Sequence, residues 1–259
     1  MPLDAMRDAH AGGPGVLHVY HPLGYPDAQR SESYVGAALA AGAGVAELGI
    51  PFSDPVADGP VLQAASAAAL AQGTTPRSAL ATLAALRRRH PRAGLVAMAY
   101  ANTLHRLGWA DAARLLREAG ADGVIVPDMP LAEARRVAPR FAHEGVPWVP
   151  IVSSTVPAPA VRALAACDPP FLYVASLGVT GRDGPGAEAA ATLARVRREA
   201  PRVPVVLGFG VRDAGDVRSA RAAGAHGVVV GSALVRRIAD GATPEEHGAA
   251  IARLQQACR

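Results

Sequence analysis

One short joint occurs three times in this sequence and limits the folds that the chain can adopt. Residues 41–46, 119–124 and 223–228 each begin with Ala-Gly-Ala and reach a valine by the fifth or sixth residue. Glycine placed just after a helix reverses the chain, because it adopts the left-handed conformation without a steric cost. Each copy therefore joins a helix end to a strand, and repeated joints of this kind predict successive strand–helix units.

Eight apolar runs of strand length alternate with helical segments along the chain. The predicted strands cover residues 16–20, 44–50, 95–99, 124–126, 147–152, 171–176, 203–207 and 227–230. The predicted helices cover residues 27–41, 60–72, 76–89, 109–119, 131–143, 156–167, 187–200 and 213–223, with a last helical stretch from residue 231. Units of roughly 32 residues are typical of a (β/α)8 barrel, so we predict a single TIM barrel domain over residues 1–259. The alternative, a doubly wound open sheet, is less favoured because no Gly-x-Gly-x-x-Gly follows the first strand.

Several absences bear on where the protein works. The sequence has no run of about 18 apolar residues, so no membrane span is expected. Its first residues lack the charged-then-apolar pattern of a secretory signal. The two cysteines, Cys167 and Cys258, are far apart and lack metal-type spacing. These features predict a cytoplasmic location, where thiols stay reduced.

A formal charge of +4 raises the question of a nucleic-acid partner. The arginines are spread over predicted helix faces, and the tightest run, Arg87-Arg88-Arg89, ends a helix, where cations suit the helix dipole. Aromatic residues make up 4% of the chain, too few for base-stacking platforms. We therefore expect a small-molecule substrate and no nucleic-acid partner.

Lysine is absent, so all 26 basic residues are arginine. A Schiff-base aldolase and an ordinary pyridoxal phosphate enzyme each need a lysine amine, which the always-protonated arginine cannot replace. Two histidines lie near predicted strands, His21 and His226, but neither belongs to a cluster with the spacing of metal ligands. The sequence thus excludes Schiff-base chemistry and predicts no metal site.

Two carboxylates stand out around the second predicted strand. Glu47 lies within its apolar run, and Asp58 lies on the proline-rich loop that follows. A carboxylate inside an apolar strand loses its hydration, which raises its pKa and suits it to donate or accept a proton. A second carboxylate over the same strand end can serve the other side of a reaction. The structural alternative is that Glu47 caps a strand end or pairs with an arginine, while Asp54 and Asp58 are turn residues.

Glycines follow the last three predicted strands, at Gly178 to Gly181, Gly208 to Gly210, and Gly231-Ser232. Glycine lets backbone N–H groups approach an anion, and a helix starting at Gly231-Ser232 would add its positive end. Barrels often bind phosphate beside the seventh and eighth strands. We predict a phosphate site there, although turns also use glycine for backbone reasons alone.

The run from Glu47 to Pro60, Glu-Leu-Gly-Ile-Pro-Phe-Ser-Asp-Pro-Val-Ala-Asp-Gly-Pro, resembles the signature of the tryptophan synthase α subunit family. The resemblance extends over essentially the whole chain. It implies a lyase, without cofactor or metal, that reversibly cleaves indole-3-glycerol phosphate to indole and glyceraldehyde 3-phosphate. It also implies that Glu47 moves the proton at indole C3 and that Asp58 binds the ring N–H.

The resemblance further implies which residues contact the substrate. The implied substrate-binding residues are Tyr20, Tyr100, Ile125, Ile151, Tyr173 and Phe209. The implied phosphate-binding residues are Thr180, Gly181, Gly210, Gly231 and Ser232. For each apolar residue taken alone, a place in the barrel core is the alternative.

The sequence departs from the family pattern in two loops. The first is Pro22-Leu23-Gly24-Tyr25-Pro26, and the second, at Ser176-Leu177-Gly178, is one residue shorter than usual. In the family the second loop closes over substrate and signals to a β subunit, so we expect an αββα complex in which coupling to that subunit is weaker. The sequence also leaves open whether the lyase is the α subunit itself or a stand-alone paralogue that produces free indole. The remaining alternatives are a non-catalytic partner that activates a β subunit and another phosphate-binding barrel lyase or isomerase.

Overall fold

The computed structural model describes residues 6, 10, 15–175, 187–208 and 210–259, and its strands form one parallel sheet. The strands are β1 (Val16–Pro22), β2 (Val45–Gly49), β3 (Gly94–Met98), β4 (Gly123–Ile125), β5 (Trp148–Val149), β6 (Ile151–Val152), β7 (Leu172–Ala175), β8 (Val205–Gly208) and β9 (Gly227–Val230). They are ordered β5-β4-β3-β2-β1-β9-β8-β7-β6, so neighbours along the chain are neighbours in space.

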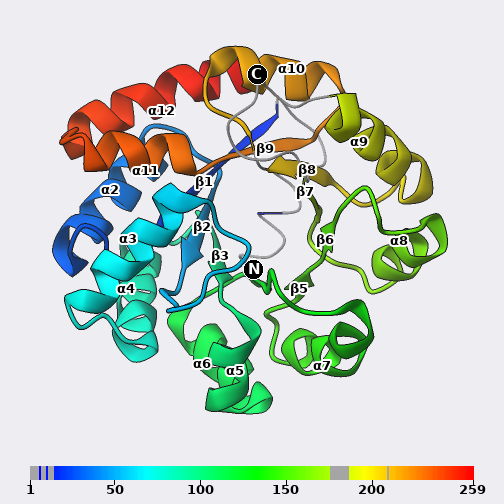
Figure 1. The fold of residues 1–259 in the computed structure, drawn as a ribbon, viewed down its shortest axis with the longest axis horizontal. Helices are drawn as coiled ribbons and strands as arrows, with labels where there is room; N and C mark the ends of the chain where they lie inside the picture. Colours follow the sequence, from blue (N-terminus) through cyan, green and yellow to red (C-terminus); the bar gives the residue numbers. More distant parts are fainter. Residues whose placement is uncertain (1–5, 7–9, 11–14, 176–186, 209) are drawn as a thin grey trace.

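Helices surround this sheet in a ring (Figure 1). In the described residues they are α2 (Ala28–Ala40), α3 (Pro60–Ala71), α4 (Pro76–Arg89), α5 (Ala101–Leu107), α6 (Trp109–Ala119), α7 (Leu131–His143), α8 (Ala158–Ala165), α9 (Ala187–Glu199), α10 (Ala214–Ala222), α11 (Ser232–Ala239) and α12 (Pro244–Cys258). None of the described helices is long and apolar enough to cross a membrane. The predicted (β/α)8 barrel is confirmed.

Pro150 divides the fifth predicted strand in two. β5 pairs with β4, and β6 pairs with β7. Proline has no N–H to donate to a ladder, but the Pro150 carbonyl still accepts a 2.9 Å hydrogen bond from the Tyr173 N–H. The two ends of the sheet therefore meet at this residue, and the nine strand segments make an eight-unit barrel.

The structure also adds a helix and divides another. α5 occupies residues that lie in no predicted helix or strand, and it ends at Gly108, whose φ of 82° lets the chain turn directly into α6. The last helical stretch is α11 followed by α12. The break falls at Gly241, with φ of 90°, and Thr243 then starts α12 with a capping box.

Alternation along the strands produces two apolar layers. Every second side chain points into the barrel, where Val16, Val45, Val96, Val206 and others form one buried cluster. The side chains between them pack outward beneath the helices in a larger cluster. Because Glu47 is two residues from Val45, this alternation aims its carboxyl group into the barrel.

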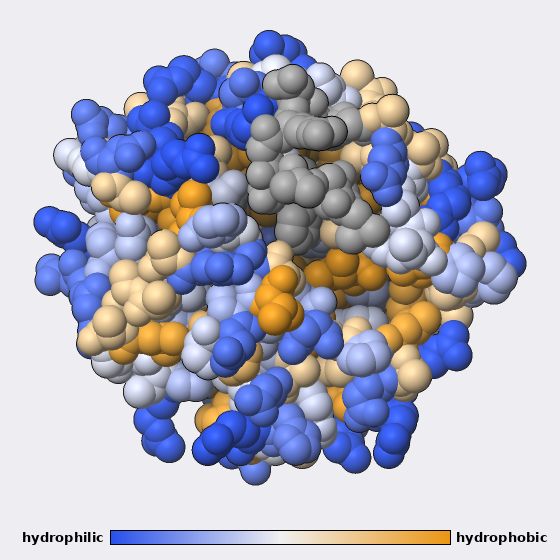
Figure 2. Space-filling model, in the orientation of Figure 1, coloured by the Kyte–Doolittle hydropathy of each residue, from blue (hydrophilic) through white to orange (hydrophobic). Residues whose placement is uncertain are grey.

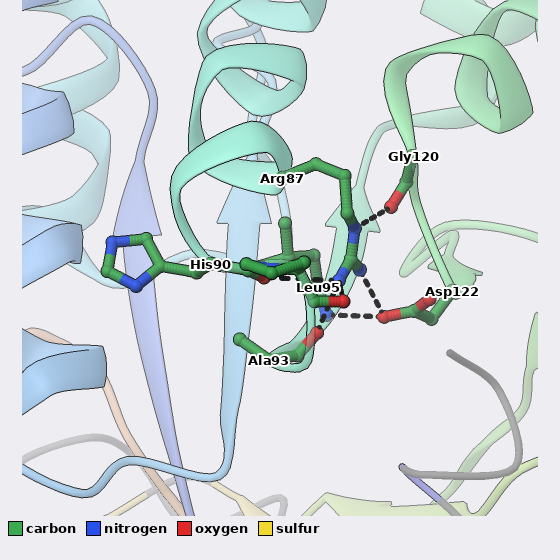
Figure 3. Close-up of polar contacts among 7 residues, drawn as sticks. Arg87, His90, Ala93, Leu95, Gly120 and Asp122 are labelled. Carbon is green, nitrogen blue, oxygen red and sulfur yellow. Dashed lines mark hydrogen bonds and ion pairs between the residues drawn. The ribbon is translucent and has the colours of Figure 1, made fainter. Parts of the chain in front are cut away.

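Arg87, at the end of α4, clamps the segments that lead into β3 and β4 (Figure 3). Its guanidinium donates to the carbonyls of Gly120 and Ala93 at 3.0 and 2.8 Å, and to the Asp122 carboxylate at 2.6 Å. Asp122 also accepts the Leu95 N–H at 2.8 Å. This arginine therefore satisfies carbonyl groups between elements, in addition to its favourable place at a helix end.

Candidate active site

A cavity of about 400 Å³ opens among the segments that follow β2, β8 and β9. This size suits a small-molecule ligand. The lining residues are Tyr20, Asp58, Gly59, Pro60, Val61, Leu62, Met98, Tyr173, Gly210, Val211, Arg212, Val229, Gly231, Ser232, Ala233, Arg236, Arg237 and Asp240. Six of the residues predicted to act on substrate are among them. On the face seen in Figure 2, hydrophilic residues predominate around the rim and several hydrophobic residues lie nearer the middle.

Two tyrosines from β1 and β7 form the inner wall of the cavity. Tyr20 and Tyr173 are each 7% exposed, and burial raises the pKa of both phenols well above the ordinary value. Each hydroxyl lies against a glycine of the next strand. A Cβ at Gly49 would come within 2.3 Å of the Tyr20 hydroxyl, and one at Gly208 within 2.0 Å of the Tyr173 hydroxyl. These two glycines are required because any side chain there would displace the tyrosines.

Glu47 lies in the barrel interior next to this cavity but is not among its lining residues. Its side chain is 1% exposed, and burial raises its pKa to about 8. Its Oε1 is 2.9 Å from Nδ1 of His18, which lies one inward position before Tyr20 on β1. Glu47 therefore has the strand position and the raised pKa that the sequence predicts. Its carboxyl group is turned toward the amino end of β1.

Asp58 lines the cavity from the loop after β2. Burial raises its pKa to about 6, and a hydrogen bond with Tyr100 opposes that shift. Tyr100, at the end of β3, does not line the cavity. It holds the loop instead, because its hydroxyl accepts the Ala57 N–H at 3.1 Å and its ring stacks on Phe52 with centroids 5.2 Å apart.

Ile125 and Ile151 lie in the inner layer of the barrel. Ile125 is fully buried within the inner cluster, and Ile151 is half-buried and packed against it. Neither lines the cavity, so the structure places both in the barrel core that the sequence offered as the alternative for such residues. Thr180, Gly181 and Phe209 lie outside the described residues, as does the shortened loop that begins at Ser176.

The part of the cavity wall that follows β8 and β9 suits an anion. Gly210, Gly231 and Ser232, three of the residues predicted to bind phosphate, line it. Gly210 has φ of 80°, and α11 begins at Ser232 with Gly231 as its N-cap. The first N–H groups of a helix lack intrahelical acceptors and carry the positive end of its dipole, so this wall presents donors to a negative group.

Sequence reasoning missed several residues here. Three arginines, Arg212, Arg236 and Arg237, line the anion side of the cavity. Arg212 follows β8, so its place after a strand was a usable signal. His18 was also missed, although its spacing of two from Tyr20 places both on the inward face of β1. No pattern in the sequence points to His10, which contacts His18.

The parallel barrel holds a buried carboxyl group whose pKa is raised to about 8, a second carboxylate on the neighbouring loop and a wall that suits an anion. These features define a class of barrel enzyme that uses acid–base chemistry on a phosphorylated substrate. The model of one family, described as tryptophan synthase alpha chain, matches residues 7–259. This chain belongs to the tryptophan synthase alpha chain family.

Individual relatives agree with this assignment. The chain is 40% identical over 239 residues to the tryptophan synthase alpha chain of Roseiflexus sp. strain RS-1, covering 92% of this chain and 90% of that one. It is 39% identical over 238 residues to that of Synechococcus sp. strain CC9902, covering 90% and 88%. Tryptophan synthase alpha chains cleave indole-3-glycerol phosphate to indole and glyceraldehyde 3-phosphate. The chain is therefore a carbon–carbon lyase of tryptophan biosynthesis.

Solved structures match over the full length. The alpha subunit of Legionella pneumophila strain Paris superposes with a TM-score of 0.90 at 28% identity, covering 99% of this chain and 98% of that one. A chain of tryptophan synthase from M. tuberculosis, in its aminoacrylate-bound form, gives a TM-score of 0.88 at 28% identity, covering 100% and 99%.

Proposed function

We propose that this chain cleaves indole-3-glycerol phosphate with Glu47 and Asp58 as its working carboxyl groups. The observation that carries the proposal is the contrast between them. Glu47 is almost fully buried with its pKa raised to about 8, whereas Asp58 lines the cavity with a pKa of about 6. At neutral pH the first holds a proton and the second is ionised, which separates the acid from the anion.

The reaction must overcome a poor leaving group, because an indole carbanion is unstable. Protonating C3 of the ring produces an indolenine cation that accepts the electrons of the breaking bond. Glu47 supplies that proton and then takes one from the glycerol hydroxyl, while Asp58 binds the ring N–H and stabilises the positive charge. A positioned acid–base group contributes roughly 10²–10⁴-fold to the rate.

Different parts of the cavity wall contact the indole ring and the phosphate of the substrate. Apolar Leu62, Met98 and Val229 lie with the two tyrosines and suit the indole ring. Gly210, Gly231 and Ser232 present backbone donors to the phosphate, and Thr180 and Gly181 remain predicted phosphate ligands. The Glu47 carboxyl reaches the substrate by turning from His18 toward the cavity.

The test uses the purified chain and indole-3-glycerol phosphate, with indole release as the readout. Glu47→Gln keeps the size of the side chain but cannot carry the proton, so turnover should fall at least 100-fold in a variant that folds normally. Near-normal turnover in folded Glu47→Gln would remove Glu47 from the mechanism.

We further propose that the chain acts in the cytoplasm as one barrel domain and assembles with a tryptophan synthase β subunit as αββα. The family assignment supports this, and the M. tuberculosis chains that it matches belong to proteins described as tryptophan synthase. The shortened loop predicts that a β subunit changes the indole-release rate little. Sedimentation of a mixture tests assembly, and rates with and without the β subunit test the coupling.

A further inference from the structure

A row of buried polar side chains crosses the barrel interior and ends on Glu47. The Met6 carbonyl is 2.7 Å from His10 Nδ1, and His10 Nε2 is 2.8 Å from His18 Nε2. His18 Nδ1 is in turn 2.9 Å from Glu47 Oε1. His10, His18 and Glu47 are 4%, 0% and 1% exposed, so water does not compete for these bonds.

The carbonyl at one end fixes the proton positions along the whole row. A carbonyl only accepts, so His10 Nδ1 carries a proton and neutral His10 accepts through Nε2. His18 must then donate through Nε2, which leaves Nδ1 of neutral His18 as an acceptor. Glu47 is therefore the donor in the last bond, and a donor carboxyl group is a protonated one.

Burial favours this neutral arrangement over an ion pair. It lowers the pKa of His10 and His18 to about 3 and raises that of Glu47 to about 8. Among the residues that the structure describes, the other titratable groups around Glu47 are the phenols of Tyr20 and Tyr173 and, farther away, Asp58, and none of these is a cation.

The surroundings of the two histidines are also apolar or neutral. Phe171 stacks on His10 with centroids 5.5 Å apart and meets His18 edge-on at 5.1 Å. In the described part of the chain, His226 is the other titratable group near His10, and burial lowers its pKa as well. Separating charge between His18 and Glu47 would therefore cost desolvation without a compensating partner among the described residues.

Removing the proton from Glu47 breaks one of the hydrogen bonds that join Glu47, His18, His10 and the Met6 carbonyl. A carboxylate needs a donor at His18 Nδ1, so His18 must change tautomer and its Nε2 becomes an acceptor. His10 must then also change tautomer, which leaves its Nδ1 facing the Met6 carbonyl with no hydrogen between them. One buried hydrogen bond is lost whichever way the row rearranges, and a lost bond of this kind is destabilising.

We propose that His18, held in one tautomer by His10, is a positioning residue that keeps the catalytic proton on Glu47 and aims the carboxyl group until it turns to the substrate. The inference rests on the proposed role of Glu47. In the cycle the Glu47 proton moves to indole C3, and the C–C bonding pair returns to the ring. The hydroxyl proton then passes to the carboxylate as its O–H pair forms the aldehyde, so Glu47 ends protonated and again bonds His18.

The experiment compares pH profiles of kcat for indole release. His18→Asn places an amide N–H donor toward Glu47, which stabilises the carboxylate. The limb on which activity falls at high pH should then move down by at least one pH unit, so that this shift lowers activity about fivefold or more at pH 8 and hardly changes it at pH 6. His10→Leu frees His18 to change tautomer and should move the limb in the same direction by less.

His21→Asn is the matched control. His21 is also on β1, 4% exposed, with a pKa lowered to about 3, but it bonds the Tyr25 carbonyl and does not contact Glu47. It should lower stability and leave the limb in place. A limb that stays in place in folded His18→Asn and His10→Leu overturns the inference.

A second readout does not depend on activity. The infrared C=O stretch of a protonated carboxyl group, taken as the difference between the unaltered chain and Glu47→Gln, reports the Glu47 proton directly. Its titration midpoint should fall in both histidine variants, and an unchanged midpoint overturns the inference. If Glu47→Gln keeps its turnover while the midpoint still shifts, the proposed function fails and the proton-holding role of His18 stands.

Discussion

The hydroxyl of Tyr100 accepts a 3.1 Å hydrogen bond from the backbone N–H of Ala57, the residue before Asp58. The loop that carries one carboxylate is thereby fixed to the end of β3, a strand that neighbours the one carrying the other carboxylate. Three further interactions reinforce the geometry. Tyr100 stacks on Phe52, hydrogen-bonds with Asp58, and is followed by Ala101, whose N–H bonds Asp128 at 2.8 Å.

Tyr100→Phe should raise the pKa of Asp58, because the Tyr100 hydrogen bond lowers it. Asp58 acts as an anion, so the low-pH limb of kcat, expected near the Asp58 pKa of about 6, should move to higher pH. The loss of the Ala57 bond should cost about 1 kcal/mol of stability. Tyr34→Phe is the control, since it loses a bond to the Ala242 carbonyl elsewhere, and its pH profile should not change.

Asp58→Asn keeps the shape of the side chain and removes its charge. The indolenine cation forms only along the reaction, so the lost attraction belongs to the transition state. We expect kcat to fall at least 100-fold with a change in KM of a few-fold, measured by steady-state indole release. A rise in KM with kcat unchanged would reassign Asp58 to ground-state binding.

Gly210→Val should weaken phosphate binding, because a side chain would stand between the backbone and the anion. We expect KM to rise at least tenfold, and inorganic phosphate to compete with substrate in the unaltered chain. The matched control is Gly73→Val. Its φ of 84° gives the same backbone strain as the 80° of Gly210, and Gly73 does not line the cavity. An equal effect of both changes on KM would place the phosphate elsewhere.

Stability should fall as the pH drops from 6.5 to 5. Burial lowers the pKa of His10, His18 and His21 to about 3 and that of His247 to about 4. Below their ordinary pKa of about 6.5, the unfolded chain binds protons that the folded chain does not, at a cost of up to about 1.4 kcal/mol per pH unit for each group.

The carboxyl groups of Glu47 and Asp58 have the opposite effect on stability, which they raise as the pH falls. Glu47 and Asp58 have pKa values raised to about 8 and about 6, so the folded chain keeps protons that the unfolded chain releases. Four groups outweigh two over this range, and the urea midpoint should be lower at pH 5 than at pH 6.5. An equal or higher midpoint at pH 5 would contradict the neutral state of the buried histidines.

The sequence by itself determined the parts of this protein that depend on local pattern. Glycine joints and apolar runs placed the alternating strands and helices, because helix ends and buried strands are specified by residues close together in the chain. The same pattern placed Glu47 within a strand and Asp58 on the loop after it. Gly210, Gly231 and Ser232 were located at strand ends for the same reason.

The tertiary structure decided which side chains meet across the barrel. His18 and Glu47 are 29 residues apart, and they bond only because β1 and β2 pair in a register that sets Tyr20 opposite Glu47. Closure at Pro150 and the placing of the cavity arginines likewise need the complete ring of strands. Such contacts depend on strand register and barrel closure, which are properties of the whole sheet that a local run of residues does not encode.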